Sequence, residues 1–334
     1  MEKLSFPWHS AAWREFEAAL AAGRLGHAYL IEGPQGLGKL HLAFRMAARV
    51  LGIEWPAVDP PLPLQHPDLN WITLETDDEG KQKKQIGIHQ IREACASLAM
   101  TSYSGGWKVA VVWPAEQLNP HSANALLKTL EEPAPRTLLL LVRSRLDTLP
   151  ATIASRCQRV RIAPPPATEA IPWLEARAGG GDWQRLLSLA GDAPLMALLL
   201  AEEGFRELDR KFAADLVGIL GRRREALEVA AEWARQPLPM TLRWLDVWTS
   251  ELVRWRTAGT GATLEAAPQR ALQTALEGIP LQRLFRYKDE VRSAMTRNDG
   301  VFNTQMVLEG LLAPWADRLE PVLGDAAQGM LSDR

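Results

Sequence analysis

Residues 28–40 read AYLIEGPQGLGKL, and this stretch decides the fold. The apolar run 28–32 predicts a short buried strand, and residues 40–51, whose apolar side chains share one face, predict a helix. The segment between them follows G-x-x-x-x-G-K-[ST], a loop whose backbone N–H groups hold phosphate. Its matching residues are Gly33, Gly36, Gly38 and Lys39. A chance glycine-rich turn is the alternative, but strand, turn and helix stand in the order that the loop requires.

The groups that perform chemistry around such a loop are absent. Leu40 stands where a Ser or Thr would hold Mg²⁺, and a leucine side chain cannot bind a metal. The acids that hold Mg²⁺ and orient water normally follow a second apolar strand, but Trp113 and Pro114 take their places. Glu116 comes shortly afterwards, and we expect it to be an ordinary exposed carboxylate. We therefore expect no intrinsic hydrolysis, no bound metal, and no nucleotide cofactor held by Lys39.

Five short apolar runs predict strands that alternate with helices. They are Ala28–Glu32, Leu69–Leu74, Val109–Trp113, Thr137–Val142 and Gln158–Ile162. Helical patterns at 86–100 and 122–132 lie between them, and this alternation predicts an α/β fold with a parallel sheet. The wholly apolar run 138–142 indicates a central strand that is covered on both faces.

The proline-rich segment 163–167 ends this pattern, because proline fixes φ and removes a backbone donor. Beyond it the chain shows helical patterns only. Two of them carry apolar stripes, formed by Trp244, Leu245, Trp248, Leu252 and Trp255, and by Val301, Leu308, Leu311 and Trp315. Such stripes suit a helix–helix interface or an internal core. We predict an α/β domain at 1–165, a small helical domain at 166–205 and an all-helical domain at 206–334.

Composition excludes several classes of protein. The chain has 334 residues, of which 47% are hydrophobic, so sizeable cores can form. It contains no apolar run of ~18 residues, so no membrane span is expected. Cys95 and Cys157 are the only cysteines, which excludes a disulfide framework and a four-cysteine zinc site. The N-terminal residues lack the charged, apolar and small-residue series of a signal peptide, so we expect none, and a reducing cytoplasm fits best. A net charge of −2 gives no general basic bias for nucleic acid.

Two further motifs give the chain a specific resemblance. Residues 124–133 read NALLKTLEEP, and residues 155–157 read SRC. This pair, at this distance from the phosphate-binding loop, resembles the bacterial clamp-loader subunits of the AAA+ superfamily. The missing phosphate-site groups make the chain most similar to the delta prime family of DNA polymerase III subunits, and the likeness covers nearly its whole length. The resemblance implies a helical lid domain and a C-terminal helical collar domain.

The resemblance also implies a function. Arg156, the arginine of SRC, would be an arginine finger that acts in trans on ATP held by a neighbouring subunit. The chain would be a non-hydrolysing stator in a DNA-directed DNA polymerase holoenzyme, with gamma or tau motor subunits, the delta subunit, the sliding clamp and primer–template DNA as partners. A structural arginine paired with a local carboxylate is the alternative for Arg156. We expect Arg156 at the surface, near the C-terminal rim of the sheet, facing a partner.

The chain departs from its active relatives at three places. Many relatives carry a four-cysteine zinc module in the interval matching 52–70, which here holds no cysteine, and His66 is expected to be a turn residue. Arg143 matches a polar position that senses the γ-phosphate. Pro194 lies near the position of a second-domain arginine. These changes agree with an inactive phosphate site and predict no zinc.

Two other functions remain open from the sequence. An active AAA+ motor ATPase of the gamma or tau type would need another residue to bind Mg²⁺, and none is evident. A DNA-binding module without ATP chemistry would need a basic stripe, which the composition does not provide.

Overall fold

The computed structural model describes residues 5–54, 65–76, 80, 82–144, 149–202, 204–258, 272, 274–276, 278–297 and 303–319. Its sheet has five strands, β1 Ala28–Glu32, β2 Leu69–Ile72, β3 Lys108–Val112, β4 Thr137–Arg143 and β5 Gln158–Arg161. They pair in the order β2-β3-β4-β1-β5, and every pair is parallel. The predicted α/β class and all five predicted strands are confirmed.

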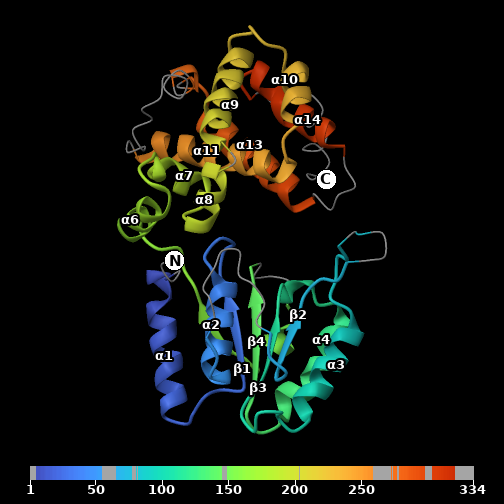
Figure 1. The fold of residues 1–334 in the computed structure, drawn as a ribbon. Coiled ribbons are helices and arrows are strands. Elements are labelled where there is room, and N and C mark those ends of the chain that lie inside the picture. The colour runs from blue at the N-terminus through green and yellow to red at the C-terminus, as the bar shows by residue number, and fades with distance from the viewer. Residues whose placement is uncertain are drawn as a thin grey trace, which may run out of the picture. The chain divides into compact units, whose positions relative to one another are not determined.

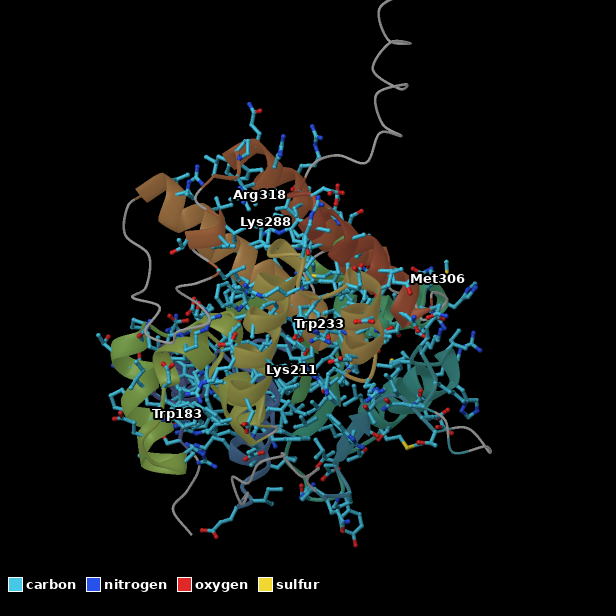
Figure 2. All side chains as sticks on the ribbon, turned by 90° about the horizontal axis from the view of Figure 1, so that it is seen from above. Trp183, Lys211, Trp233, Lys288, Met306 and Arg318 are labelled. Atoms are coloured by element: carbon cyan, nitrogen blue, oxygen red, sulfur yellow. The ribbon has the colours of Figure 1, made fainter. Side chains whose placement is uncertain are left out.

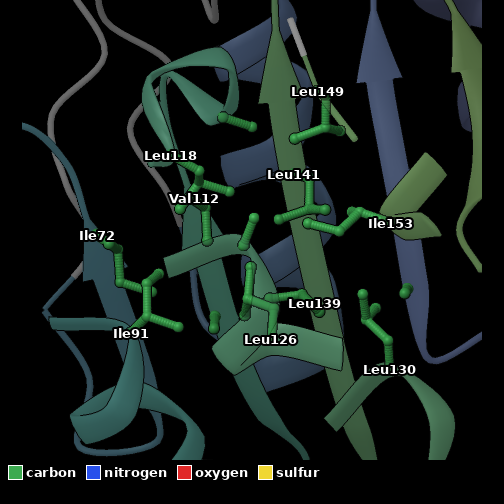
Figure 3. Close-up of a cluster of buried hydrophobic side chains, with 14 of the residues drawn as sticks. Ile72, Ile91, Val112, Leu118, Leu126, Leu130, Leu139, Leu141, Leu149 and Ile153 are labelled. Atoms are coloured by element: carbon green, nitrogen blue, oxygen red, sulfur yellow. The ribbon is translucent and has the colours of Figure 1, made fainter. Parts of the chain in front are cut away.

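Helices cover both faces of the sheet (Figure 1). On one face lie α1 Ser10–Ala21 and α2 Lys39–Leu51, and on the other α3 Ile88–Ala99 and α4 Pro120–Glu131. Successive strand residues point to opposite faces. The central strand β4 therefore sends Leu138, Leu140 and Val142 into the core beside α2, and Leu139 and Leu141 into the core beside α3 and α4. Figure 3 shows the second core, a cluster of buried side chains to which Leu139, Leu141, Val112, Ile91 and Leu126 all belong.

Short elements complete this part of the chain. They are η1 Pro7–His9, η2 Ala115–Gln117 and α5 Ala151–Ala154. After the prolines at 164–166 come α6 Ala167–Ala178, α7 Trp183–Leu189 and α8 Pro194–Glu202. The helical pattern expected after the proline segment is therefore confirmed, with α6 ending just before the glycines 179–181, whereas a separate small helical domain stays a prediction.

By compactness the chain divides into two units. The first contains Met1–Trp183 and Asp192–Ala197, and the second contains Gln184–Gly191 and Leu198–Arg334. The domain boundaries at 165 and 205 stay a prediction. No helix among the described residues combines the length and the apolar character that crossing a bilayer demands.

The second unit is built from helices alone in its described part. They include α9 Phe205–Leu220, α10 Ala226–Trp233, α11 Leu238–Ala258, α13 Leu281–Arg297 and α14 Thr304–Ala316. Helix α11 packs on α13, and α10 packs on α14. Trp233, labelled in Figure 2 among these helices, is 1% exposed, whereas Met306, at the edge of the same view, is 68% exposed.

Both predicted stripes serve as core in this unit. The described members are buried: Trp244, Leu245, Trp248 and Leu252 in α11, and Leu308, Leu311 and Trp315 in α14. The side chain of Trp255 and all of Val301 lie outside the described residues. The stripes therefore fill the interior of this chain, which is the second of the two uses that the sequence allowed.

Candidate functional site

The loop between β1 and α2 has the backbone of a phosphate-binding loop. Gly36 and Gly38 adopt φ values of 82° and 74°, in the left-handed region where a side chain is strained. At Gly33 a Cβ atom would lie 2.1 Å from the carbonyl oxygen of Ile162, so only glycine fits. The glycine pattern is thus required by the turn itself, and the strand–loop–helix prediction is confirmed. We call residues 33–39 the phosphate loop.

Lys39 is turned onto its own loop. Its Nζ atom donates a hydrogen bond to the carbonyl of Pro34 at 2.5 Å, and the residue is only 5% exposed. Burial lowers the pKa of Lys39 to about 8, and the negative charge of Glu116 partly opposes that shift. The lysine that would reach the phosphates of a nucleotide therefore already has an acceptor within the protein.

Residues that stand where metal-binding groups would be expected make apolar contacts instead. Leu40 packs, partly buried, against the core beside α2. Trp113, which follows β3, stacks on Trp71 with ring centroids 6.3 Å apart. Among the described residues no group of three His, Cys, Asp or Glu side chains converges as a metal would need. Pro194, near the expected arginine position of active relatives, begins α8.

Glu116 differs from its expected role as an ordinary exposed carboxylate. It lies in η2, which turns back over the C-terminal edge of the sheet, and its Oε1 atom accepts a hydrogen bond from the backbone N–H of Ser144 at 3.0 Å. Its Oε2 atom is buried and has no hydrogen-bond partner among the described residues. The expectation of an ordinary exposed carboxylate was wrong, because the turn at η2 brings Oε1 to the N–H of Ser144 and buries Oε2.

The N-terminal segment covers the phosphate loop from outside. The Nε1–H of Trp8 and the Nε2–H of His9 both donate to the carbonyl of Leu37, at 3.0 and 2.7 Å. The ring of Phe6 lies against Gly38, where an added Cβ would come within 3.1 Å of it. Burial lowers the pKa of His9 to about 4, more than its hydrogen bond to Leu37 raises it, so His9 is neutral near pH 7.

Residues from α6 and α8 complete this cover. The indole of Trp173 stacks on Phe6 at 5.6 Å and meets Trp8 edge-on at 5.1 Å. The backbone N–H of Leu195 donates to the carbonyl of Gly36 at 3.1 Å, and a Cβ at Gly36 would lie 2.9 Å from that of Met196. We name Phe6, Trp8, His9 and Trp173 the aromatic cover. The sequence analysis missed it, because no motif links residues so distant along the chain.

Arg143 has a structural role at the edge of the sheet. Its guanidinium is buried and donates to Oε2 of Glu32 through Nε at 3.1 Å and Nη2 at 2.5 Å. Arg161 donates to the other oxygen of Glu32 at 2.9 Å. Burial raises the pKa of Glu32, but the hydrogen bonds from Arg143 and Arg161 outweigh it and hold that pKa below the usual range. Arg143, which was expected to match a phosphate-sensing position, thus ties β4 to β1, and Arg161 ties β5 to the same carboxylate.

Arg156 lies at the surface, as expected, but not at the expected edge. It follows α5 and precedes β5, whose Gln158 pairs with Tyr29 near the start of β1. The phosphate loop follows Glu32 at the other end of β1. Placing Arg156 near the C-terminal rim was therefore wrong, because the residue before a parallel strand lies at the opposite edge of the sheet from the residue after it.

Two contacts hold the guanidinium of Arg156. Its Nη1 donates to the carbonyl of Thr152 at 2.9 Å, and its Nη2 lies 2.7 Å from Oε1 of Glu131, the last residue of α4. The two motifs singled out in the sequence, NALLKTLEEP and SRC, thus meet through a direct ion pair. The sheet separates this pair from the chain's own phosphate loop.

The segment around the expected zinc module has other contacts. His66 accepts a hydrogen bond at Nδ1 from the N–H of Asp68 at 3.1 Å, as a turn residue does. Asp68 is buried and accepts from the N–H groups of Tyr103 and Ser104 and from the hydroxyls of Ser102 and Ser104. Residues 55–64 lie outside the described part, so the absence of zinc stays a prediction.

The two cysteines are separate. Both Cys95 and Cys157 pack, partly buried, against the core beside α3 and α4. Burial raises the pKa of Cys157, the neighbour of Arg156, to about 12. This thiol is therefore un-ionised near neutral pH and serves packing.

The known proteins that this chain resembles are subunits of DNA polymerase III. The family model described as "DNA polymerase III, delta subunit" matches residues 8–166. The chain is 31% identical over 329 residues to the DNA polymerase III subunit delta' of Pseudomonas aeruginosa, covering 93% of this chain and 97% of that one. It is 28% identical over 326 residues to the delta' subunit of Haemophilus influenzae, covering 92% and 95%.

The likeness to a relative named tau is shorter. The DNA polymerase III subunit tau of Escherichia coli is 32% identical over 143 residues, which cover 41% of this chain and 22% of tau. The expected AAA+ form of the α/β fold, with a helical C-terminal part, is confirmed. Because the delta' subunit of Pseudomonas aeruginosa is 31% identical across 93% of this chain and 97% of its own, the chain belongs to the delta prime family of DNA polymerase III subunits.

Proposed function

We propose that this chain is a non-hydrolysing stator of a bacterial clamp loader, and that it supplies Arg156 to ATP held by a neighbouring subunit. The observation that carries the proposal is that the phosphate loop and Arg156 lie at opposite edges of the same sheet. The phosphate loop follows β1 at one edge, and Arg156 precedes β5 at the other. An arginine in that place can act on the nucleotide of another chain only.

The state of the phosphate loop supports the absence of hydrolysis. Lys39 donates a hydrogen bond to the carbonyl of Pro34. The carbonyl of Gly36 accepts a hydrogen bond from Leu195, and that of Leu37 accepts hydrogen bonds from the aromatic cover. Glu116 adds a carboxylate near Lys39, where a γ-phosphate would meet like charge. Binding of ATP would have to displace these contacts and would still find no ligand for Mg²⁺ at Leu40.

The chemistry of Arg156 supports its role as a finger. A guanidinium is planar, always charged and multidentate, which suits the charge that develops on a transferring γ-phosphoryl group. The side chain is partly exposed and lies on a surface that a partner can cover. The finger requires no nucleotide on its own chain, so a closed phosphate loop and a working finger are compatible.

The partners follow from the same proposal. They are gamma or tau motor subunits, the delta subunit, the sliding clamp through the complex, and primer–template DNA in the assembled loader. Relatives named delta', gamma and tau support a complex of several subunits. We propose 1–165 as the AAA+ domain, 166–205 as the lid and 206–334 as the collar, with the whole assembly in the cytoplasm as part of a DNA-directed DNA polymerase holoenzyme.

Nucleotide binding by the pure chain separates a stator from a motor ATPase. Calorimetric titration with ATP and Mg²⁺ should give no heat of binding for the wild type, for Lys39→Ala or for Leu40→Thr. The last variant should fail because Trp113 and Pro114 still replace the acids. Steady-state hydrolysis by the single chain that Lys39→Ala abolishes would instead establish the motor type.

The finger is tested in a reconstituted loader. Arg156→Ala should assemble normally, since surface changes usually alter stability by under ~0.5 kcal/mol. Clamp-stimulated hydrolysis at the adjoining site should fall sharply, because finger arginines are worth about 10³–10⁵ in rate. Arg156→Lys should not rescue, since an ammonium lacks the planar fork. Arg14→Ala, an exposed change on α1, is the matched control. Normal clamp loading by the assembled Arg156→Ala complex would refute the finger and leave a purely structural stator.

A further inference from the structure

The finger arginine already has a carboxylate partner in its own chain. Arg156 is held by Glu131 at 2.7 Å and by the carbonyl of Thr152 at 2.9 Å. Glu131 ends α4, and Thr152 belongs to α5, so the two contacts come from different elements. The guanidinium is therefore ordered before any partner arrives.

The pair is also weak enough to open. The side chains of Arg156 and Glu131 are 37% and 51% exposed. Ion pairs in such positions contribute only about 0–1 kcal/mol, because water and salt screen them. An Arg–carboxylate contact at this surface thus orders the side chain without trapping it.

The position of Glu131 at the end of helix α4 favours a cation beside its carboxylate. A carboxylate at the C-terminal end of a helix meets the partial negative charge of the unpaired carbonyls, which is unfavourable. The positive charge of Arg156 relieves this repulsion. When Arg156 leaves, Glu131 is exposed enough for water to take over that role.

We propose that Glu131 is the resting partner of Arg156 and that the phosphate oxygens of the neighbouring subunit's ATP replace it when the subunits dock. This inference rests on the proposed function. Arg156 contacts Glu131 through Nη2 while its Nη1 donates to Thr152, and a phosphate oxygen accepts the same kind of charge-assisted N–H, so an oxygen of ATP can take the place of Oε1 of Glu131. The triphosphate carries more charge and meets Arg156 in a less hydrated interface, so the exchange runs toward the phosphate. Glu131 is then a positioning residue that acts through Arg156.

The proposal predicts a competition that can be measured. Each time the neighbouring site binds ATP, the Glu131 contact must be lost. Removing the carboxylate should therefore favour the engaged state by up to about 5-fold, which corresponds to ~1 kcal/mol. The γ-phosphate already carries its charge in bound ATP, so the gain should appear as a lower KM with kcat little changed.

The test uses the reconstituted loader with five forms of this chain: wild type, Glu131→Gln, Glu132→Gln, Arg156→Ala, and Glu131→Gln combined with Arg156→Ala. Glu132→Gln is the matched control, because this neighbouring carboxylate is exposed at the same helix end and Arg156 pairs with Glu131 instead. Clamp- and DNA-stimulated hydrolysis is followed against ATP concentration at low and at high salt. Glu131→Gln should lower KM for ATP, Glu132→Gln should not, and the difference from wild type should shrink as salt screens the pair.

The double variant decides whether Glu131 acts through the arginine. In the Arg156→Ala background the Glu131→Gln change should have no effect on KM. A raised or unchanged KM in Glu131→Gln, or a lowered KM that persists without Arg156, overturns the resting-partner proposal while the finger itself stands. If Arg156→Ala leaves hydrolysis unchanged, the proposed function fails, and the resting-partner proposal fails with it. A purely structural role of Glu131 would lower kcat or assembly and would not respond to salt.

Discussion

The ammonium group of Lys39 donates to the carbonyl of Pro34 within the same loop, at 2.5 Å. In a nucleotide-binding loop the lysine reaches toward phosphate. Here the loop satisfies its own lysine, and the aromatic cover and α8 satisfy its carbonyls. The phosphate loop has thus become a packed structural element, which leads to the first two predictions.

The first prediction concerns the charge on Lys39. Its pKa is lowered by burial from 10.5 to about 8, so between these pH values the unfolded state binds more protons than the folded state. The free energy of unfolding of the wild type should therefore rise with pH across this window, by ~3 kcal/mol relative to Lys39→Met. Urea unfolding at several pH values measures it. Lys128 is exposed, so the control variant Lys128→Met should keep the pH dependence of the wild type. The prediction would be contradicted if the free energy of unfolding of the wild type and of Lys39→Met depended on pH in the same way.

The second prediction concerns the aromatic cover. Phe6 is 5% exposed and lies between Trp8, His9 and Trp173. Phe6→Ala should lower the free energy of unfolding by about 3 kcal/mol, because the cavity left behind cannot close fully. Phe285 on α13 is 45% exposed, and Phe285→Ala should cost under ~0.5 kcal/mol. Equal losses in denaturant unfolding of the two variants would show that the N-terminal segment does not pack on the loop.

The third prediction concerns acid stability and Asp68. Burial raises the pKa of Asp68, but the hydrogen bonds from Tyr103, Ser104 and Ser102 outweigh it and hold the pKa well below its ordinary value of 3.8. The carboxylate therefore stabilises the fold above pH 3.8, and this contribution is lost as the pH falls further.

Asp68→Asn should cost about 3 kcal/mol at pH 7, since the new amide N–H₂ faces groups that are themselves donors. The difference between wild type and variant should narrow below the unfolded-state pKa. Circular dichroism during urea unfolding at pH 7 and pH 3 measures both effects. The exposed Glu54→Gln should change neither value, and a constant difference between Asp68→Asn and wild type at the two pH values would argue against the assignment.

The fourth prediction concerns Asp209 in the helical unit. This buried carboxylate accepts from Arg185 and from the indole N–H groups of Trp244 and Trp248, at 2.6 and 2.9 Å for the two indoles. Asp209→Ala should cost about 3–5 kcal/mol, because the largely buried Arg185 is left without its carboxylate. Asp246 pairs with the exposed Arg292, and Asp246→Ala should cost under ~1 kcal/mol. Tryptophan fluorescence during urea unfolding follows both variants, and similar losses would disprove the distinction.

Much of the fold was predictable from local sequence. The run expected at Val109–Trp113 is the strand Lys108–Val112, and the helix expected at 40–51 is Lys39–Leu51. Central strands of a parallel sheet are buried on both faces, so their residues form apolar runs that can be read without knowing their partners. The glycines of the phosphate loop were also predictable from local sequence, because their φ values are set within the turn itself.

The parts of the site that depend on distant residues were not predictable. Glu116 was expected to be exposed, but its Oε1 atom accepts a hydrogen bond from the N–H of Ser144 and its Oε2 atom is buried. Arg156 was expected at the C-terminal rim and lies at the opposite edge, beside Glu131. Phe6 and Trp173 stack although 167 positions separate them along the chain. The indole N–H of Trp173 also donates a hydrogen bond to the carbonyl of Ser5, 168 positions away.

The sequence by itself determined the strands, the loop and the loss of its metal ligands, because each depends on residue type and on neighbours a few positions away. A leucine side chain cannot bind Mg²⁺, whatever the position of Leu40 in the fold. Gly36 and Gly38 have positive φ values, which only glycine adopts without strain. The tertiary structure alone decided which groups contact the phosphate loop and where Arg156 lies. Lys39 turns inward, aromatic rings cover the loop, and Arg156 meets Glu131 only once the sheet has brought distant segments together, since such contacts depend on chain topology and not on local preference.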